Sequence, residues 1–460
     1  MVSFILPGNS ASGGYEVANS VRLNQGDHAH FSKTPSTSNG TTFTYSFWVK
    51  RGRVDINSFM LRMIASDNSE VDLLFEPSGN IRIQDYEGVS GANKWKYVTN
   101  RLFRDTSAWM HILYVVDTNN GTASDRVQLY INGVRETSFS TATNPSSGAT
   151  SALAKGEARG IGGQVGGSSN SFDGYMAEVV YVDGTAKSTT DFGEFDEDTG
   201  IWKPIDVSGM SLGSNGWYLD FEDSSSLGND ASGSNNWTSN NLTSTDQTTD
   251  TCTNNFATFN PLLNNWTAIS EGNLKVTNTS QAYRDVFSTV ALTSGKWYVE
   301  CRIDTEIGGT YPIFGIADAS QYSYPAQVNL LGRSSLGWGF QTDGNYYNNN
   351  ADAGNWSTLD NGDIIGFYLD LDSSQNTLKV YKNGSSELSL NISDPVDGYY
   401  FGCSTYQEDS VSGSINFGNP SFSISSGNSD ANGYGNFEYS PTLSGVNYYA
   451  ICTKNLAEYG

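Results

Sequence analysis

Two short stretches, "LYINGV" at 129–134 and "VYKNGS" at 380–385, decide the fold of this chain. Each closes a run of alternating apolar and polar residues, "DRVQLYINGV" and "NTLKVYKNGS". Such alternation predicts a half-buried β-strand, and the Asn-Gly pair predicts a tight hairpin turn because both residues tolerate positive φ. We therefore expect two equivalent hairpins, with Leu129, Ile131, Leu378 and Val380 facing inward and Tyr130 and Tyr381 on the opposite face.

The composition favours β-structure along the whole chain. Of 460 residues, 37% are hydrophobic, 13% are aromatic, only 16% are charged and 49 are glycine. Few charges combined with many turn formers and aromatic residues disfavour long helices and suit short strands. At roughly 100–200 residues per domain, the length allows for two to four domains.

The charge and cysteine content exclude several classes of partner. A net charge of −24 repels phosphates and anionic membranes, so we expect no nucleic-acid partner. No stretch approaches the roughly 20 apolar residues of a spanning helix, so we expect no membrane insertion. No secretory signal is visible and the cysteines (Cys252, Cys301, Cys403 and Cys452) show no metal-binding spacing, which predicts synthesis in a reducing cytoplasm.

Two series of alternating segments divide the chain. The first ends with "SFDGYMAEVVYVDGT" and the second begins with "GKWYVECRI". We predict an all-β fold with two antiparallel β-sandwiches of jelly-roll type in tandem. The expected parts are an arm over 1–20, a sandwich over 21–200, a connector over 201–260 partly packed on the sandwiches, a sandwich over 261–425, and a segment over 426–460 with a final strand in "NYYAICTK". No helix longer than a turn or two is expected.

The first series resembles a known superfamily. "AWMHILYVVDTNNGTASDRVQLYINGV" and "GIGGQVGGSSNSFDGYMAEVVYVDGT" resemble the laminin-G/concanavalin A-like lectins over about 21–200. The matching features are the Trp-x-His strand, the "LYxNG" hairpin, the "IGG" strand and the closing "FDGYxxEV" element. The resemblance implies a concanavalin A-like sandwich.

The second series is similar to SPRY domains over roughly 261–425. The ordered motifs are "SGKWYVEC", "FGIAD", "GWGFQTDGNYYNN", "GDIIGFYLDLDSSQNTLKVYKNG", "GYYFGCSTY" and "INFG". The tandem as a whole resembles virion structural proteins of tailed bacteriophages, through "DFGEFDEDTGIWKPI", "TNNFATFNPL" and "FEYSPTLSGVNYYAICTKNL" among other stretches. This resemblance implies a surface or appendage component of a phage particle.

A hydrolase motif fails on its context. "GMSLG" at 209–213 matches Gly-x-Ser-x-Gly, but that nucleophile elbow requires a downstream histidine. The three histidines, His28, His30 and His111, all lie upstream. His111 sits on a strand beside Trp109, which indicates a structural role. His28 and His30 share a face but have no third metal ligand nearby.

A glycosidase motif and a calcium loop also fall short. Glu194, Asp196 and Asp198 alternate as in laminarinase-like enzymes, which carry Glu-x-Asp-x-Glu. The shorter third acid displaces its oxygen by about 1 Å, which such chemistry tolerates poorly. "DTNNGTASDRVQ" lacks the Gly and Glu that an EF-hand loop requires. We therefore assign no catalytic residue, no metal ligand and no cofactor, and leave an irregular calcium loop open.

Exposed aromatic residues suggest a binding surface instead. Within "GWGFQTDGNYYNNNADAGNW" we expect Tyr346, Tyr347 and Trp356 in a loop, beside Asn348. Aromatic rings together with amide groups suit glycan recognition, and binding sites concentrate on loops. The alternative is that these rings only pack the edge of the sandwich.

Together these features predict a non-enzymatic virion structural protein, made in the bacterial host cytoplasm. The leading hypothesis is an exposed appendage or tail-fibre-type component that binds host surface glycans or proteins. The first alternative is a capsid decoration protein that binds other virion subunits, and the second is a glycan-acting enzyme. In either virion role we expect other virion proteins as partners and a homo-oligomer.

Overall fold

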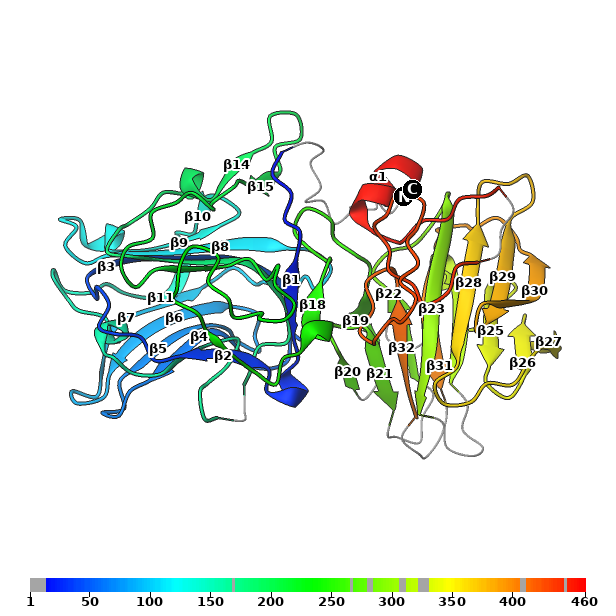
Figure 1. Cartoon of the computed structure of the whole chain (residues 1–460), viewed down its shortest axis with the longest axis horizontal. Coiled ribbons are helices and arrows are strands. Elements are labelled where there is room, and N and C mark those ends of the chain that lie inside the picture. The colour runs from blue at the N-terminus through cyan, green and yellow to red at the C-terminus, as the bar shows by residue number, and fades with distance from the viewer. Residues whose placement is uncertain are drawn as a thin grey trace. The chain divides into compact units, whose positions relative to one another are not determined.

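A computed structural model describes residues 14–167, 170–264, 268–278, 284–305, 312–321, 331–405, 411–441 and 445–460 (Figure 1). The chain divides into two compact units between Thr253 and Asn254. Each unit contains two large antiparallel sheets with a hydrophobic core of its own. The predicted all-β fold of two antiparallel sandwiches is confirmed.

The N-terminal unit is built from two eight-stranded sheets and a small hairpin. The β3 sheet contains, in spatial order, β10 (Val134–Arg135), β9 (Val127–Ile131), β8 (Met110–Asp117), β3 (Thr42–Arg51), β13 (Gly174–Asp183), β1 (Ser20–Leu23) and β18 (Gln247–Thr248), with β16 (Trp217–Leu219) also paired to β13. The β5 sheet contains β11 (Phe139–Thr143), β7 (Ala92–Thr99), β6 (Ile81–Glu87), β5 (Glu70–Phe75), β4 (Ser58–Ile64), β12 (Arg159–Ile161), β2 (His30–Lys33) and β17 (Thr238–Asn240). The hairpin pairs β14 (Gly193–Phe195) with β15 (Trp202–Pro204).

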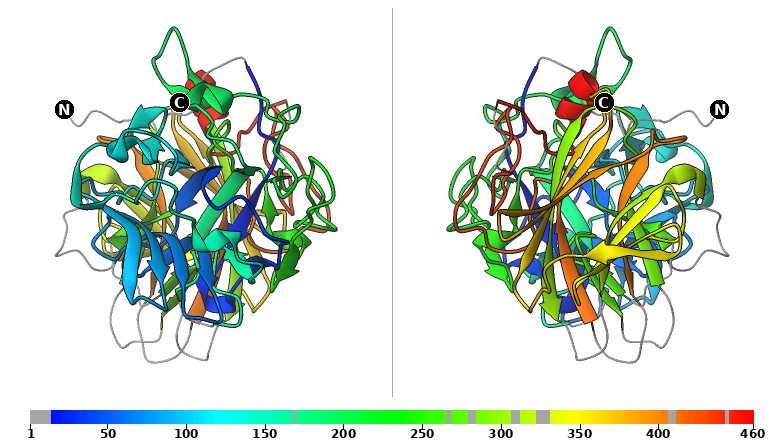
Figure 2. Two further views of the ribbon diagram at one scale, coloured as in Figure 1. Left: turned by 90° about the vertical axis from the view of Figure 1, so that its left-hand side faces the viewer. Right: turned by 90° about the vertical axis from the view of Figure 1, so that its right-hand side faces the viewer.

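The described residues of the C-terminal unit form two seven-stranded sheets. The β24 sheet contains β19 (Phe259–Asn264), β22 (Arg284–Ser288), β31 (Tyr399–Thr405), β24 (Ile313–Asp318), β25 (Gly337–Gln341), β26 (Asn345–Asn348) and β27 (Ala351–Asn355). The β28 sheet contains β20 (Ala268–Ser270), β21 (Lys275–Asn278), β32 (Val411–Asn416), β23 (Lys296–Thr305), β28 (Ile364–Asp370), β29 (Thr377–Lys382) and β30 (Ser385–Asn391). Figure 2 shows the same ribbon from two further directions.

Helices are short wherever the structure is described. The 3₁₀ turns are η1 (Gln25–Asp27), η2 (Ala123–Asp125), η3 (Ala152–Ala154), η4 (Thr189–Asp191), η5 (Ser244–Asp246) and η6 (Ala319–Gln321), and the α-helix is α1 (Thr453–Tyr459). None of the described helices has the length and apolar content needed to cross a bilayer.

The two Asn-Gly turns are built alike. Asn132 and Asn383 both have φ of 48°, and the glycines that follow have φ of 75° and 78°. In each turn the Asn Oδ1 accepts a hydrogen bond from a backbone N–H at the edge of the neighbouring strand, at 2.7 Å from His111 and 2.9 Å from Ile364. The backbone N–H of each Asn donates in return to the carbonyl of that same neighbour, at 2.9 Å in both cases.

The strands before these turns face as expected. Leu129, Ile131, Leu378 and Val380 are at most 2% exposed and lie in the two sandwich cores. Tyr130 and Tyr381 lie on the opposite faces, but they do not face open solvent. Instead, a further layer of chain covers the outer face of each of these sheets.

This layer contains the segment that follows each sandwich. In the N-terminal unit, Phe192, Val207 and Leu212 pack on outward residues of β8 and β13. In the C-terminal unit, Phe437, Tyr448 and Ala450 pack on Tyr298, Tyr368 and Tyr381. Each covered sheet therefore buries apolar side chains on both of its faces.

Two expectations about the segments outside the sandwiches need revision. The sequence predicts a connector over 201–260 that is partly packed on the sandwiches, but strands β16, β17 and β18 in this range are part of the sheets of the N-terminal unit. The final strand in "NYYAICTK" does not form. The backbone of Tyr449 bonds to β23 whereas that of Ile451 bonds to Phe417 and Ala257, so no continuous ladder develops, and α1 follows directly.

Candidate functional site

The predicted aromatic loop is largely a strand. Tyr346, Tyr347 and Asn348 lie in β26, and Trp356 directly follows β27. The expected loop context is therefore wrong for the first three residues. The alternation of β26 sends Tyr346 and Tyr347 to opposite faces of the β24 sheet.

Tyr346 and Trp356 both contact the core. The Tyr346 ring stacks on Phe340 with centroids 5.7 Å apart, and the Trp356 ring meets the same Phe340 edge-on at 5.9 Å. Trp356 Nε1 donates to the Gln341 carbonyl at 3.1 Å. Both rings are half-buried against the C-terminal core, which is the arrangement expected if they seal the edge of the sandwich.

Asn348 donates hydrogen bonds to the backbone of a neighbouring turn. Its Nδ2 donates to the carbonyl of Gly337 at 2.9 Å and reaches those of Ser334 and Ser335 at 3.3 and 3.4 Å. Tyr347 is half-buried, and burial raises the pKa of its hydroxyl. Binding at these four residues stays a prediction, and the contacts of Tyr346, Asn348 and Trp356 account for their positions without a ligand.

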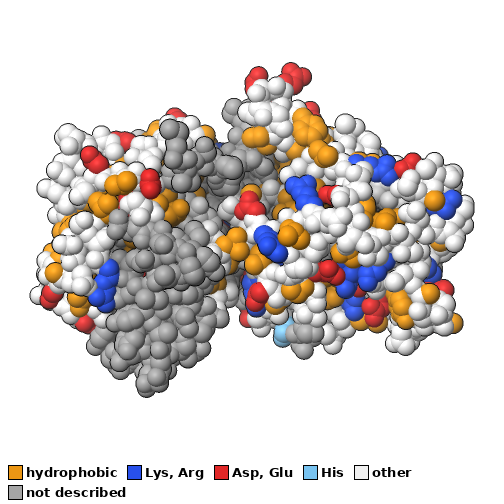
Figure 3. All heavy atoms as spheres, turned by 180° about the vertical axis from the view of Figure 1, so that it is seen from behind, with side chains coloured by type: hydrophobic (Ala, Val, Ile, Leu, Met, Phe, Trp, Pro, Cys, Tyr) orange, Lys and Arg blue, Asp and Glu red, His pale blue; other side chains and the backbone are white. Residues whose placement is uncertain are grey.

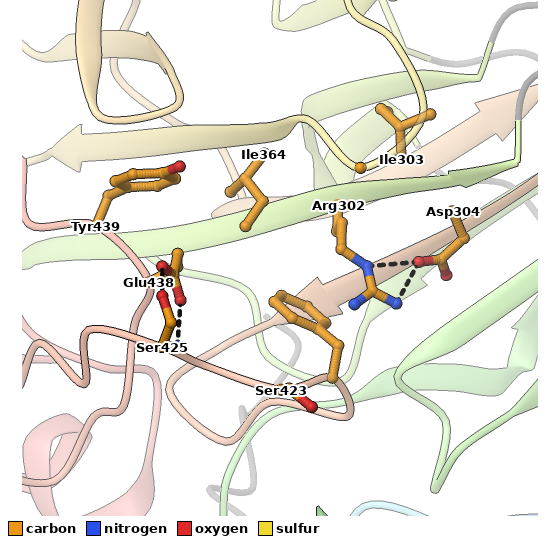
Figure 4. A pocket seen from close by; sticks show the side chains of 10 residues that line it. Arg302, Ile303, Asp304, Ile364, Ser423, Ser425, Glu438 and Tyr439 are labelled. Atoms are coloured by element: carbon orange, nitrogen blue, oxygen red, sulfur yellow. Dashed lines mark hydrogen bonds and ion pairs between the residues drawn. The ribbon is translucent and has the colours of Figure 1, made fainter.

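A pocket of about 440 Å³ lies elsewhere in the C-terminal unit (Figure 4). Arg302, Ile303 and Asp304 of β23 form one wall, and the start of β28 supplies Ile364. The other wall comes from the covering segment, through Phe422, Ser423, Ser425, Glu438 and Tyr439. The volume falls within the range of about 300–1,000 Å³ found for small-molecule sites.

Arg302 is held in one orientation at this pocket. Its Nε donates to Asp304 Oδ1 at 2.6 Å, and Nη2 lies 2.5 Å from the same oxygen. The guanidinium also covers the Phe422 ring at 4.4 Å from the centroid. No described residue accepts a hydrogen bond from Nη1, which leaves an oriented donor at the pocket.

Glu438 presents a charged carboxylate on the opposite wall. Burial works to raise its pKa, but hydrogen bonds from Ser425 and Ser426 outweigh that effect and the pKa is lowered. The Ser425 N–H donates to Glu438 Oε2 at 2.6 Å, and the Ser425 hydroxyl donates to Oε1. Figure 4 shows Glu438 and Tyr439 on one side of Ile364 and the Arg302–Asp304 pair on the other.

The buried Glu300 fixes this wall to the sheet. Its carboxylate accepts the backbone N–H groups of Glu438 at 2.9 Å and Tyr439 at 2.7 Å. Asn416 Nδ2 donates to it at 3.2 Å. Burial raises the pKa of Glu300 to about 7.

The "VYKNGS" turn contacts two residues that line the pocket, Tyr439 and Ile364. A methyl group on Gly384 would lie 2.8 Å from Tyr439 Cδ1, so only glycine lets the ring approach this closely. Asn383 bonds to the backbone of Ile364 and donates through Nδ2 to Asp363 at 2.8 Å. The hairpin that marks the fold therefore also positions two residues of the pocket.

The pocket residues carry no local signal in the sequence. Arg302 and Asp304 occupy alternate positions of a strand, a pattern that predicts only that both side chains face outward. Glu438 and Tyr439 come from a segment more than 130 residues later, which contributes to the site only through the covering layer. Sequence reasoning missed the site because it depends on that tertiary contact.

The rejected catalytic motifs belong to the N-terminal unit, whereas the pocket belongs to the C-terminal unit. His111 is buried, and its Nε2 lies 2.8 Å from Ser46 Oγ while Trp202 Nε1 donates to Nδ1 at 3.2 Å. Burial lowers the pKa of His111 to about 3, so it is a neutral structural residue. Ser211 of "GMSLG" is exposed, and residues 212–221, which directly follow it, contain no helix.

Of the three alternating acids, Glu194 lies in β14, and Asp196 and Asp198 lie in the turn between β14 and β15. Lys203 pairs with Glu194 at 3.4 Å and with Asp196 at 3.2 Å. Hydrogen bonds from Thr199 lower the pKa of Asp196 to about 2, the opposite of the shift a general acid requires. Asp198 is exposed, and its backbone N–H donates to Asp196 Oδ1 at 3.2 Å within the turn.

No metal centre is found in the part of the chain that the structure describes. No group of three or more His, Cys, Asp or Glu residues there is placed to hold an ion. All four cysteines are buried free thiols. One face of the surface is shown in Figure 3, where cationic and anionic side chains are interspersed rather than gathered in large patches of one sign.

One sequence-family model matches the N-terminal unit. Residues 23–190 match the sequence model Laminin_G_3 of the Concanavalin A-like lectin/glucanases superfamily. No curated protein matches the sequence. Among solved structures, the SPRY domain of human HERC1 is 20% identical with a TM-score of 0.30, and the match covers 34% of this chain and 96% of that one.

Two further solved structures are similar to the chain. A human SPRY domain is 19% identical with a TM-score of 0.25, over 31% of this chain and 89% of that domain. Stonustoxin is 15% identical with a TM-score of 0.26, over 35% of this chain and 27% of the toxin chain. The N-terminal unit thus resembles the concanavalin A-like lectin domains over residues 23–190, in a chain of all-β sandwiches.

Proposed function

We propose that this protein is a non-enzymatic surface component of a tailed-bacteriophage virion that binds host surface glycans or proteins. The assignment to a virion rests on the sequence resemblance of the two tandem sandwiches to virion structural proteins of tailed bacteriophages. The binding assignment rests on one observation, the pocket in which an oriented Arg302 faces the Glu438 carboxylate across an apolar floor. Both groups are fixed by other residues before any ligand arrives, which lowers the entropic cost of binding.

The sandwiches provide a rigid frame for such a role. Their cores and covering layers fix β23, β28 and the 422–439 segment, whereas the pocket itself opens to solvent. Host glycans are the favoured ligands because the pocket combines apolar surface with a few oriented polar groups.

The alternative role is capsid decoration, in which the chain binds other virion subunits. It is favoured by the sheet edges, since β30 and β27 are terminal strands of their sheets and carry mostly exposed or half-buried residues. Such edges are available for pairing with another chain.

Cryo-electron microscopy of the particle separates the two roles. We expect density at the tail or another appendage, in the small copy number of such a structure. High-copy density on the capsid faces would instead establish decoration. A glycan array with the isolated protein tests the binding role, and binding to no arrayed sugar would count against it.

A further inference from the structure

The C-terminal pocket combines hydrogen-bond donors and acceptors around an apolar floor. Arg302 Nη1 is a donor without an acceptor among the described residues, and the hydroxyls of Tyr439 and Ser423 likewise form no hydrogen bond with those residues. The Glu438 carboxylate has lone pairs beyond those that Ser425 occupies. Ile364 and Phe422, both buried, form the apolar floor between these groups.

This set of groups matches the chemistry of a polyol, which presents several hydroxyls at once. Each alcohol hydroxyl donates one hydrogen bond and accepts others, so one hydroxyl of a sugar ring can donate to Glu438 while another accepts from Arg302. The C–H face of a pyranose ring can then lie on the side chain of Ile364, while the Phe422 ring stays beneath the Arg302 guanidinium. An ordinary alcohol or an apolar molecule would leave one side of the pocket unsatisfied.

The charges at the pocket favour a neutral ligand over an anion. The lining contains one cationic side chain, Arg302, and two anionic ones, Asp304 and Glu438. Asp304 already neutralises the guanidinium through Nε and Nη2. A phosphate or carboxylate ligand would meet the charge of Glu438, whose lowered pKa keeps it ionised at neutral pH.

We propose that this pocket binds a neutral pyranose, two of whose hydroxyls are held by Arg302 Nη1 and the Glu438 carboxylate over Ile364. The inference rests on the proposed function and names the ligand class for it. Arg302 and Glu438 select the hydroxyl pair, while Tyr439 and Ser423 supply further hydroxyl contacts at the rim.

The test is calorimetric titration of the full chain with methyl α-glycosides of glucose, mannose and galactose. At least one should bind, with a Kd on the order of 1 mM, the affinity expected of a small ligand making few contacts. Its analogue with one of the paired hydroxyls replaced by hydrogen should bind at least about tenfold more weakly, because a charged pocket group loses its partner. Inorganic phosphate should neither bind nor compete.

Variants then locate the binding. Ser423→Trp should abolish it by filling the pocket from an exposed position, whereas Ser374→Trp, at an exposed residue outside the lining, should leave it unchanged. Tyr439→Phe keeps the ring on Gly384 and should weaken binding about fivefold. Arg302→Lys keeps the charge but loses the planar fork, and should weaken binding at least about tenfold.

The outcomes separate this inference from the proposed function. Glycan binding that Ser423→Trp leaves intact would overturn the pocket assignment and leave the binding function standing. Phosphate binding that competes with the pyranoside, or equal affinity for the deoxy analogue, would overturn the assignment to a pair of ring hydroxyls. If neither a pyranoside nor any arrayed glycan binds the folded chain, both the inference and the glycan-binding role fail.

Discussion

At the scale of single residues, Glu300 shows how one buried carboxyl orders a distant surface segment. It lies on β23, yet it accepts the backbone N–H groups of two residues of the pocket wall. Its raised pKa of about 7 is the consequence of placing a carboxyl in a buried position. Pocket geometry and protonation are therefore linked at this residue.

We expect Glu300 to make the stability of the C-terminal unit depend on pH. Its folded pKa of about 7 lies above the ordinary value of 4.5, so the folded protein holds the proton more tightly than the unfolded chain. The stabilising contribution of Glu300 to the free energy of unfolding is therefore full below about pH 4.5. It falls by up to about 3 kcal/mol as the pH rises to about 7. Urea denaturation of wild type and Glu300→Gln at several pH values measures it, and an unchanged pH slope in the variant would refute the linkage.

Trp356 should act mainly as a packing residue. Its half-buried ring meets Phe340, so Trp356→Ala should lower the free energy of unfolding by about 2 kcal/mol through lost packing. Val396→Ala, at a side chain that is 67% exposed, should change it by less than about 0.5 kcal/mol. Denaturant titration compares the two. If Trp356→Ala keeps the stability of the wild type but loses glycan binding, Trp356 is a ligand-binding residue, as the sequence predicts, and not a packing residue.

At the scale of elements, the two Asn-Gly hairpins repeat one construction in both units. In each, the Asn side chain caps the neighbouring strand and the glycine lies against an aromatic ring of the covering layer. For Gly133 that ring belongs to Trp202, and for Gly384 it belongs to Tyr439. The motif therefore holds two strands and the covering segment together.

Three glycine variants of the N-terminal unit should separate the cost of a strained φ from the cost of a clash with the Trp202 ring. Gly133→Ala combines a strained φ of 75° with a methyl group 2.4 Å from the Trp202 ring, and should cost about 3 kcal/mol. Gly200→Ala has φ of 70° but open space, and should cost about 1 kcal/mol. Gly121→Ala, with neither feature, should be neutral. Thermal unfolding of the three variants gives the order, and equal shifts for the first two would show that the ring contact contributes nothing.

The hairpins could be predicted from the sequence because their signal is local. Alternation followed by Asn-Gly fixes the strand, the turn and the inward face within ten residues. The covering layer and the pocket could not be predicted, since Trp202 and Tyr439 reach their glycines from segments with no regular pattern. Tyr346 and Tyr347 were placed in a loop because their polar surroundings hide the short strand β26.

At the scale of the whole molecule, the chain repeats one plan twice. Each unit has its own core, its own pair of large sheets and its own covering segment drawn from the chain that follows the sandwich. The boundary at Thr253 and Asn254 separates these cores. Two separate cores favour two unfolding events rather than one.

Scanning calorimetry should resolve those two transitions. Gly133→Ala should lower the transition of the N-terminal unit, and Trp356→Ala should lower that of the C-terminal unit. Each should leave the other transition unchanged within about 1 °C. A single transition that both variants shift equally would show that the units unfold as one.

The most direct test of the proposed binding function is a glycan array probed with wild type, Ser423→Trp and Ser374→Trp. We predict that wild type and Ser374→Trp bind the same neutral glycans and that Ser423→Trp binds none of them. Identical binding by all three proteins, or no binding by the folded wild type, would contradict a glycan site in the C-terminal pocket.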